Sequence, residues 1–135
     1  MRENIKMPLE GQGAVLIVED SENSASTLEI ALLAIPGLSV LVASSAVEAL
    51  RILRDGRLAV RAVVTDLNMP RMDGFELIER IREDGTLHAT PIIVISGDTD
   101  PATPDRIAKL GVSAFFPKPF SPAAVRQKLE QLLNA

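Results

Sequence analysis

Three acidic residues follow short apolar runs, at points where a buried strand would end. Glu19 and Asp20 come directly after Ala14–Val18, and Asp66 comes shortly after Ala62–Val64. Carboxylates a few Å apart raise one another's pKa, so a cluster of them is costly without a cation. Mg²⁺ relieves the repulsion, because it takes octahedral oxygen ligands and commonly combines one or two carboxylates with waters and a phosphate. These residues therefore indicate a divalent-cation site that could receive a phosphoryl group.

Two further polar residues follow the remaining apolar runs. Ser96 comes after Ile92–Ile95, and Lys118 comes after Ala114–Phe116. A hydroxyl and an ammonium beside a carboxylate–metal site supply a hydrogen bond and a counter-charge for phosphate oxygens. Taken alone, Ser96 also fits a turn residue and Lys118 a surface lysine. Because an X–Pro bond adopts the cis form at modest cost, Lys118–Pro119 is a candidate cis peptide that would aim the lysine into the same crevice.

The elements that must position these residues alternate between strand and helix. The apolar runs are mostly continuous, as in parallel strands covered on both faces. The predicted strands are Ala14–Val18, Leu38–Val42, Ala62–Val64, Ile92–Ile95 and Ala114–Phe116. Between them, apolar residues recur at helical spacing. The four predicted core stripes are Leu28, Leu32 and Ile35; Val47, Leu50 and Leu53; Phe75, Ile78 and Ile81; and Val125, Leu129 and Leu132.

Right-handed crossovers turn this alternation into a doubly wound parallel sheet of the α/β class. In such sheets ligands bind outside the carboxyl ends of the strands, where the strand order reverses. If the strand order is 2-1-3-4-5, the first and third strands are neighbours at that point. Glu19, Asp20 and Asp66 would then lie together in one crevice.

Capping patterns predict where four of the helices begin. The pairs are Ser45 with Glu48, Asp73 with Glu76, Thr103 with Pro104, and Ser121 with Pro122. The fourth helix, about residues 104–110, is the weakest, because it is short and Pro101 and Pro104 lie in its approach.

Length and composition limit the classes of function that this chain can have. The chain has 135 residues, enough for one domain, and 47% of them are hydrophobic, which excludes a disordered protein. It has no Cys, so disulfides and thiol chemistry are excluded. A net charge of −4 gives no reason to expect nucleic-acid binding, and no apolar run approaches the roughly 20 residues of a membrane span. We expect a cytoplasmic protein with a flexible leader over residues 1–13 and one domain over residues 14–135.

The chain resembles the receiver domain of two-component response regulators, in particular the chemotaxis regulators. The resemblance extends from Ala14 to the C-terminus. Its matching segments are Val18–Asp20, Asp66–Gly74, Ser96–Asp98 and Lys118–Phe120. The segment that begins at Asp66 is long and specific, whereas Lys-Pro alone would be weak. The resemblance implies a five-stranded, flavodoxin-like (βα)5 fold with strand order 2-1-3-4-5.

The resemblance also implies roles for residues at the strand ends. Asp66 would be the phosphoacceptor, attacking the phosphorus of a phosphohistidine on a histidine kinase or phosphotransfer protein to form an aspartyl phosphate. Asp20, Asp66 and the backbone carbonyl of Asn68 would bind Mg²⁺. Glu19 would support the ion through a water, and Lys118 would pair with a phosphate oxygen.

The same resemblance implies a switch. Ser96 would hydrogen-bond the phosphate, and Phe115 would change rotamer as Ser96 is drawn inward, although Phe115 is equally a core residue of the fifth strand. Asn68 and Asp98 would tune the lifetime of the phosphoryl group. The shift in population would alter the surface formed by the fourth helix, the fifth strand and the fifth helix. That surface is expected to contact an unknown output partner or a second copy of the chain.

Three other functions compete with this one. A Mg²⁺-dependent phosphatase with an Asp nucleophile would need a second Asp two residues later as general acid, and Asn68 stands there. A nucleotide-binding module would need a Gly-rich loop after the first strand, where the sequence from Glu19 to Asn23 has no Gly. A docking pseudo-receiver would not need the phosphorylation residues, all of which are present. We predict a signalling domain and not an enzyme, with at most self-catalysed phosphoryl transfer and slow autodephosphorylation.

Overall fold

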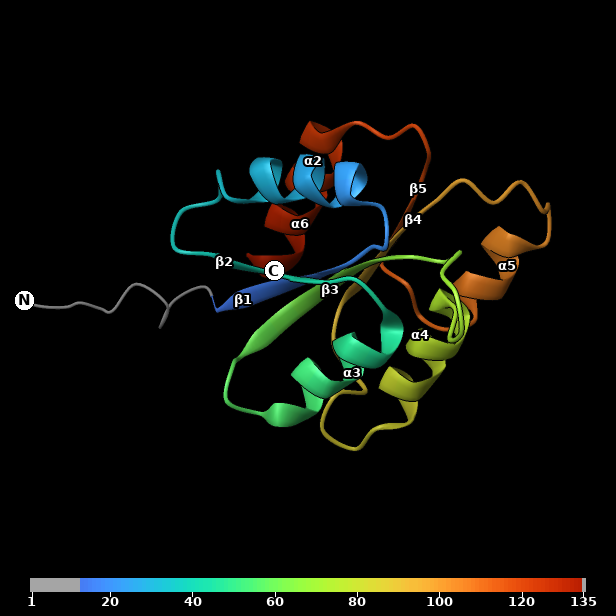
Figure 1. Ribbon diagram of the computed structural model, residues 1–135, viewed down its shortest axis with the longest axis horizontal. Coiled ribbons are helices and arrows are strands. Elements are labelled where there is room, and N and C mark those ends of the chain that lie inside the picture. Colours follow the sequence, from blue (N-terminus) through green and yellow to red (C-terminus); the bar gives the residue numbers. More distant parts are fainter. Residues whose placement is uncertain (1–12, 135) are drawn as a thin grey trace, which may run out of the picture.

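The apolar runs of the sequence form five parallel strands in the computed structural model, which describes residues 13–134 (Figure 1). The strands are β1 (Ala14–Val18), β2 (Ser39–Ala43), β3 (Val60–Asp66), β4 (Ile92–Ser96) and β5 (Ala114–Pro117). Their order in the sheet is β2-β1-β3-β4-β5, as predicted. The predicted leader lies outside the described residues except for Gly13.

Five helices connect and cover the strands. They are α2 (Glu22–Leu32), α3 (Ala46–Asp55), α4 (Gly74–Glu83), α5 (Thr103–Ala108) and α6 (Pro122–Leu133). Helices α2 and α6 lie on one face of the sheet, and α3, α4 and α5 lie on the other (Figure 1). None of the helices in the described part of the chain is long and apolar enough to cross a membrane.

The core has two halves, one on each face of the sheet. Successive residues of a strand point to opposite faces, so Leu16 of β1 packs toward α3, α4 and α5, whereas Ile17 packs toward α2 and α6. All five residues of β1 are buried. This two-sided burial is the reason that the strands read as continuous apolar runs and not as alternating ones.

Helix α3 buries a different stripe from the predicted one. Val47 was expected on the core face, but its side chain is 46% exposed. The buried residues of α3 are Ala46, Ala49, Leu50 and Leu53. Val47 lies one residue, or about 100°, around the helix from Ala46, and this displacement turns its side chain toward solvent.

Three of the four predicted helix starts are confirmed, and one is wrong. The confirmed capping bonds run from Glu48 N–H to Ser45 Oγ (3.1 Å), from Glu76 N–H to Asp73 Oδ1 (3.0 Å) and from Ala124 N–H to Ser121 Oγ (3.1 Å). Helix α5 instead begins at Thr103, with Ala102 at the N-cap, and within residues 13–134 no side chain caps it. Thr103 is buried inside the first turn, so it is not the flanking residue that a cap requires.

Arg82 of α4 binds two loops through their backbone carbonyls. Its guanidinium donates to Leu110 O (2.7 Å), His88 O (2.9 Å), Thr90 O (2.8 Å) and Gly111 O (3.1 Å). Two of these carbonyls precede β4 and the other two precede β5. Arg82 therefore anchors α4 to the amino ends of β4, which ends at Ser96, and β5, which ends just before Lys118.

Replacing Arg82 by Met is expected to lower the free energy of unfolding by about 2 kcal/mol, because partly buried carbonyls lose a charged donor. Urea unfolding measures the change. The matched control is Arg80→Met, which removes an exposed arginine from the same helix. Among the ion pairs of residues 13–134, Arg80 pairs only with Glu76, four residues earlier. Such pairs contribute no more than about 0.5 kcal/mol. Equal losses in the two variants would contradict the anchoring role.

Candidate functional site

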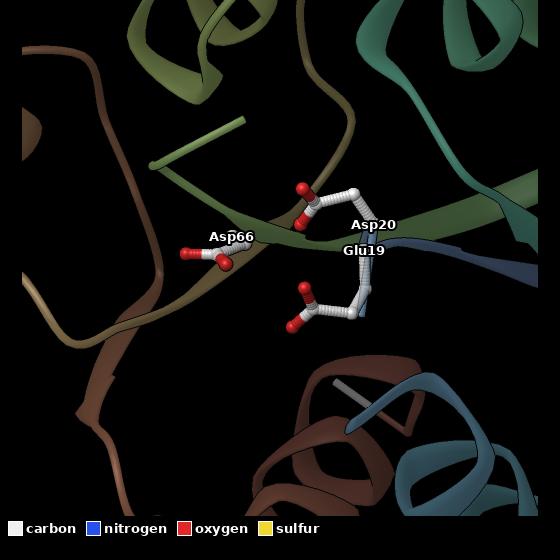
Figure 2. Close-up of side chains that lie close together, drawn as sticks. All are labelled: Glu19, Asp20 and Asp66. Carbon is white, nitrogen blue, oxygen red and sulfur yellow. The ribbon is translucent and has the colours of Figure 1, made fainter. Parts of the chain in front are cut away.

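Three carboxylates meet at the carboxyl ends of β1 and β3. Glu19 and Asp20 follow β1, and Asp66 is the last residue of β3. Figure 2 shows their side chains gathered around one region, and carboxylate oxygens from the three residues all lie within 4.8 Å of one another. Glu19 and Asp66 are buried, with 2% and 4% of their surface exposed, whereas Asp20 is exposed. The convergence expected from the strand order is therefore present.

Lys118 lies in the same site and joins two of these carboxylates. Its Nζ donates to Glu19 Oε1 and to Asp66 Oδ2, both at 2.9 Å. Burial acts to lower the pKa of Lys118, but the hydrogen bonds to the two carboxylates outweigh it, so the pKa lies above its ordinary value. The Lys118–Pro119 peptide bond, the candidate named from the sequence, has the cis conformation. The site thus contains an ammonium between buried carboxylates.

Both carboxylate oxygens of Glu19 accept a hydrogen bond. Oε1 accepts from Lys118, and Oε2 accepts from the Ser21 amide at 3.1 Å. Burial raises the pKa of Glu19, while its hydrogen bonds to Lys118 and Ser21 oppose that shift and the nearby charge of Asp66 adds to it. The sequence indicated a carboxylate near a metal but gave no sign of the direct ion pair with Lys118.

The turn after β3 orients the Asp66 carboxylate. Oδ1 accepts from the backbone amides of Leu67 (2.7 Å) and Asn68 (3.3 Å), and Oδ2 accepts from Lys118. Asn68 is exposed at the border of the site. With both carboxylate oxygens engaged, the side chain has a defined direction toward the crevice.

Gly74, the first residue of α4, packs directly on the backbone of Asp66. A Cβ at this position would collide with the Asp66 carbonyl oxygen and lie 2.7 Å from the Leu67 Cα. The Gly74 amide donates to Leu67 O at 2.9 Å. The absent side chain of Gly74 therefore lets α4 pack closely on Asp66, the residue at the centre of the site.

Ser96 and Phe115 lie on neighbouring strands in different surroundings. Ser96, the last residue of β4, is buried, and its Oγ accepts from the Asp98 amide at 3.0 Å. Phe115 of β5 is partly buried and packs with the core beneath α3, α4 and α5. It lines a cavity of about 130 Å³ together with Pro104, Ile107, Ala108, Val112 and Ala114. Ser96 therefore lies at the carboxylate edge of the sheet, and Phe115 lies beneath α5.

Arg71, in the loop after Asp66, has a left-handed backbone conformation with φ of 69°. For a residue other than glycine this conformation costs about 1–2 kcal/mol. Sequence reasoning missed it, because arginine carries no signal for a left-handed conformation. Such strain often lies beside functional sites, and here it shapes the loop between Asp66 and α4.

The donor set fits a hard divalent cation. Octahedral Mg²⁺ has oxygen ligands at about 2.1 Å, so opposite ligands lie about 4.2 Å apart. Carboxylate oxygens from the three residues lie within 4.8 Å of one another, close enough for one such ion to contact all three. Asp20 faces solvent, which leaves room for waters and a phosphate oxygen to complete the ligand shell.

The doubly wound sheet, with buried carboxylates and a lysine where its strand order reverses, defines a phosphoacceptor signalling domain. The chain belongs to the response regulator receiver domain family, whose family model matches residues 15–130. It is therefore a receiver domain of the CheY-like type that functions in two-component signalling, and the phosphatase and docking-only alternatives are not favoured.

The similar proteins include chemotaxis regulators. The chain is 33% identical over 120 residues to the chemotaxis protein CheY1 of Helicobacter pylori, covering 89% of this chain and 96% of the relative. It is 32% identical over 120 residues to the CheY homolog of Campylobacter jejuni, covering 89% and 92%. The solved structure of CheY4 of Vibrio cholerae has a TM-score of 0.79 at 28% identity, covering 90% of this chain and 99% of the other. A putative response regulator from Chloroflexus aurantiacus has a TM-score of 0.81 at 26% identity, covering 92% and 99%.

Proposed function

We propose that Asp66 is the phosphoacceptor of this receiver domain and that a histidine kinase or phosphotransfer protein is the donor. One observation carries the assignment: Asp66 is buried at the carboxyl end of β3, beside two other carboxylates and bonded to the ammonium of Lys118. A carboxylate oxygen of Asp66 forms a bond to phosphorus while the phosphorus–nitrogen bond of the donor phosphohistidine breaks. The electron pair of that bond stays on the imidazole, and the product is an aspartyl phosphate.

The cation of the site is proposed to be Mg²⁺. Asp20, Asp66 and the backbone carbonyl of Asn68 would hold it, with Glu19 acting through a water. When bound, the ion neutralises negative charge on the transferring phosphoryl group. The support for this ligand set is the fit of the carboxylate oxygens to a hard cation.

Lys118 and Ser96 supply the remaining contacts to the phosphoryl group. The ammonium of a lysine has three N–H donors. Lys118 uses two of them for Glu19 and Asp66, so the third can donate a hydrogen bond to a phosphate oxygen. Ser96 Oγ already accepts from the Asp98 amide, and its own O–H can donate to a phosphate oxygen. As Ser96 moves inward, Phe115 would change rotamer, and the cavity beneath α5 supplies space beside its ring.

The consequences of phosphorylation complete the proposal. Asn68 and Asp98 lie near the site and would tune the lifetime of the aspartyl phosphate through the access of an attacking water. The surface formed by α5, β5 and α6 would change its population of conformations and bind an output partner or a second copy of the chain. Chemistry would be limited to self-catalysed phosphoryl transfer and slow autodephosphorylation, in the cytoplasm, in a domain spanning residues 14–135.

Mass spectrometry of the intact protein tests the assignment. After incubation with Mg²⁺ and acetyl phosphate, we expect a gain of one phosphoryl group, located on the peptide with Asp66 by borohydride reduction of the aspartyl phosphate. Chelating the Mg²⁺ should prevent the gain. A phosphoryl group located on another residue, or a gain that is indifferent to Mg²⁺, would show that the proposed site is wrong.

A further inference from the structure

Helix α5 lies beside α4 (Figure 1), and two side-chain contacts join α4 to α5 or to the residues just after it. The guanidinium of Arg106 in α5 lies over the ring of Phe75 in α4, with its Cζ 3.8 Å from the ring centroid. A cation over the face of an aromatic ring is attracted by the ring's quadrupole. The second contact is that of Arg82 of α4, which binds the carbonyls of Leu110 and Gly111 just after α5.

The two attachments leave the ends of α5 unequally supported. Arg82 fixes the C-terminal end through two hydrogen bonds, and Arg106 holds the middle of the helix. At the other end the N-cap is Ala102, and no side chain of residues 13–134 caps the first turn. The helix has only six residues, too few to be stable without tertiary contacts. A displacement of α5 would therefore pivot on its C-terminal end and would have to break the Arg106–Phe75 contact.

Phe75 connects this contact to the phosphorylation site. It directly follows Gly74, whose Cα packs against the backbone of Asp66. Its own side chain is 6% exposed and belongs to the core beneath α3, α4 and α5. Arg106 thus binds α5 to the turn of α4 that touches Asp66, on the same side of the sheet as Phe115.

We infer that the Arg106–Phe75 contact is a latch that holds α5 in its unphosphorylated arrangement, with Arg82 as the pivot. This inference rests on the proposed function, since it assigns the latch to the switch that Asp66 phosphorylation drives. A contact made in only one of two arrangements opposes any ligand that favours the other. Loss of the latch should therefore loosen α5 and make the phosphorylated arrangement easier to reach.

The first test uses the unphosphorylated protein and does not depend on phosphorylation. In Arg106→Met, amide hydrogen exchange across α5 should be about two- to fivefold faster, the range that an exposed cation–π contact allows. The matched control is Lys109→Met, which removes the same charge from an exposed position three residues further on. If exchange across α5 is unchanged in Arg106→Met, or rises equally in Lys109→Met, the latch is absent.

The second test measures coupling to the site with beryllofluoride and Mg²⁺. Arg106→Met and Phe75→Leu should each bind beryllofluoride about two- to fivefold more tightly than the unsubstituted protein. The double variant should bind no more tightly than either single variant, because both substitutions remove the same contact. The latch would be overturned if the two increases in affinity were additive in the double variant. It would also be overturned if neither variant bound beryllofluoride more tightly while the Asp66-dependent complex still formed normally. Either result would leave the proposed function intact. If the unsubstituted protein binds no beryllofluoride, the proposed function fails and the latch fails with it, whereas the exchange measurement still shows whether the Arg106–Phe75 contact stabilises α5.

Discussion

Replacing Asp66 by asparagine is expected to abolish phosphorylation by acetyl phosphate and binding of beryllofluoride in the presence of Mg²⁺. The amide has nearly the shape of the carboxylate, but it is not a nucleophile for phosphorus and brings no charge to the cation. Asp66 uses one oxygen for the Leu67 and Asn68 amides and the other for Lys118. Asparagine has a single acceptor oxygen, so it cannot satisfy both sides. Mass spectrometry of the intact variant measures the loss.

The matched control is Asp73→Asn in the same loop. Asp73 caps α4 through the Glu76 amide, and asparagine serves about equally well at an N-cap, so this variant should fold and accept a phosphoryl group normally. Circular dichroism shows whether each variant is folded. Normal phosphorylation of Asp66→Asn, or equal losses in the two variants, would remove Asp66 from its proposed role.

Gly74→Ala is expected to lower the free energy of unfolding by about 3 kcal/mol and to slow phosphorylation markedly. Helix propensity alone predicts the opposite sign, since alanine is favoured over glycine by about 1 kcal/mol inside a helix. Here the added methyl would meet the Asp66 carbonyl oxygen and the Leu67 Cα, which are backbone atoms with little freedom to move. Helix α4 would have to shift, and the Asp66 carboxylate would move with its backbone. Urea unfolding and the phosphorylation rate measure the two effects.

Gly85→Ala provides the control for this substitution. A Cβ at Gly85 meets no described atom within 4 Å, and the residue follows α4 at the end far from the site. The Gly85→Ala substitution should change the free energy of unfolding of the protein by no more than about 0.5 kcal/mol and leave the phosphorylation rate unchanged. Similar behaviour of the two variants would mean that the close contact at Gly74 has no consequence for the site.

Much of the fold could be predicted from the sequence, because both faces of the sheet are covered. Double-sided burial makes each strand a short apolar run, and the cap residues show where most of the helices begin. The predictions fail where tertiary contacts override a local signal. Arg61 breaks the apolar pattern of β3 yet lies within the strand, since its guanidinium reaches the Leu133 carbonyl of α6. Thr103 has the sequence of an N-cap but is buried inside α5.

The site could be located for a topological reason. The carboxyl ends of parallel strands meet at one edge, so residues directly after the strands could be assigned to a common crevice without knowing any distance. What the sequence could not show is how side chains reach across that edge. The bond from Lys118 to Glu19 joins residues that lie on different loops, and the Arg106–Phe75 contact depends on the angle between two helices. Both are set by packing and leave no local pattern.

The bridge that Lys118 makes between Glu19 and Asp66 has a consequence for the choice of phosphodonor. Ordering a long lysine side chain costs up to about 2 kcal/mol of rotamer entropy. Because Lys118 already bonds Glu19 and Asp66, this loss of entropy occurs when the protein folds and not when a phosphodonor binds. If Asp66 accepts the phosphoryl group as proposed, the transfer would begin with Lys118 and Asp66 already oriented toward each other, and such orientation is the main benefit that proximity gives to a reaction. A small acyl phosphate and a large phosphorylated protein would meet the same preorganised centre. Selectivity between them must therefore come from the surfaces around the crevice.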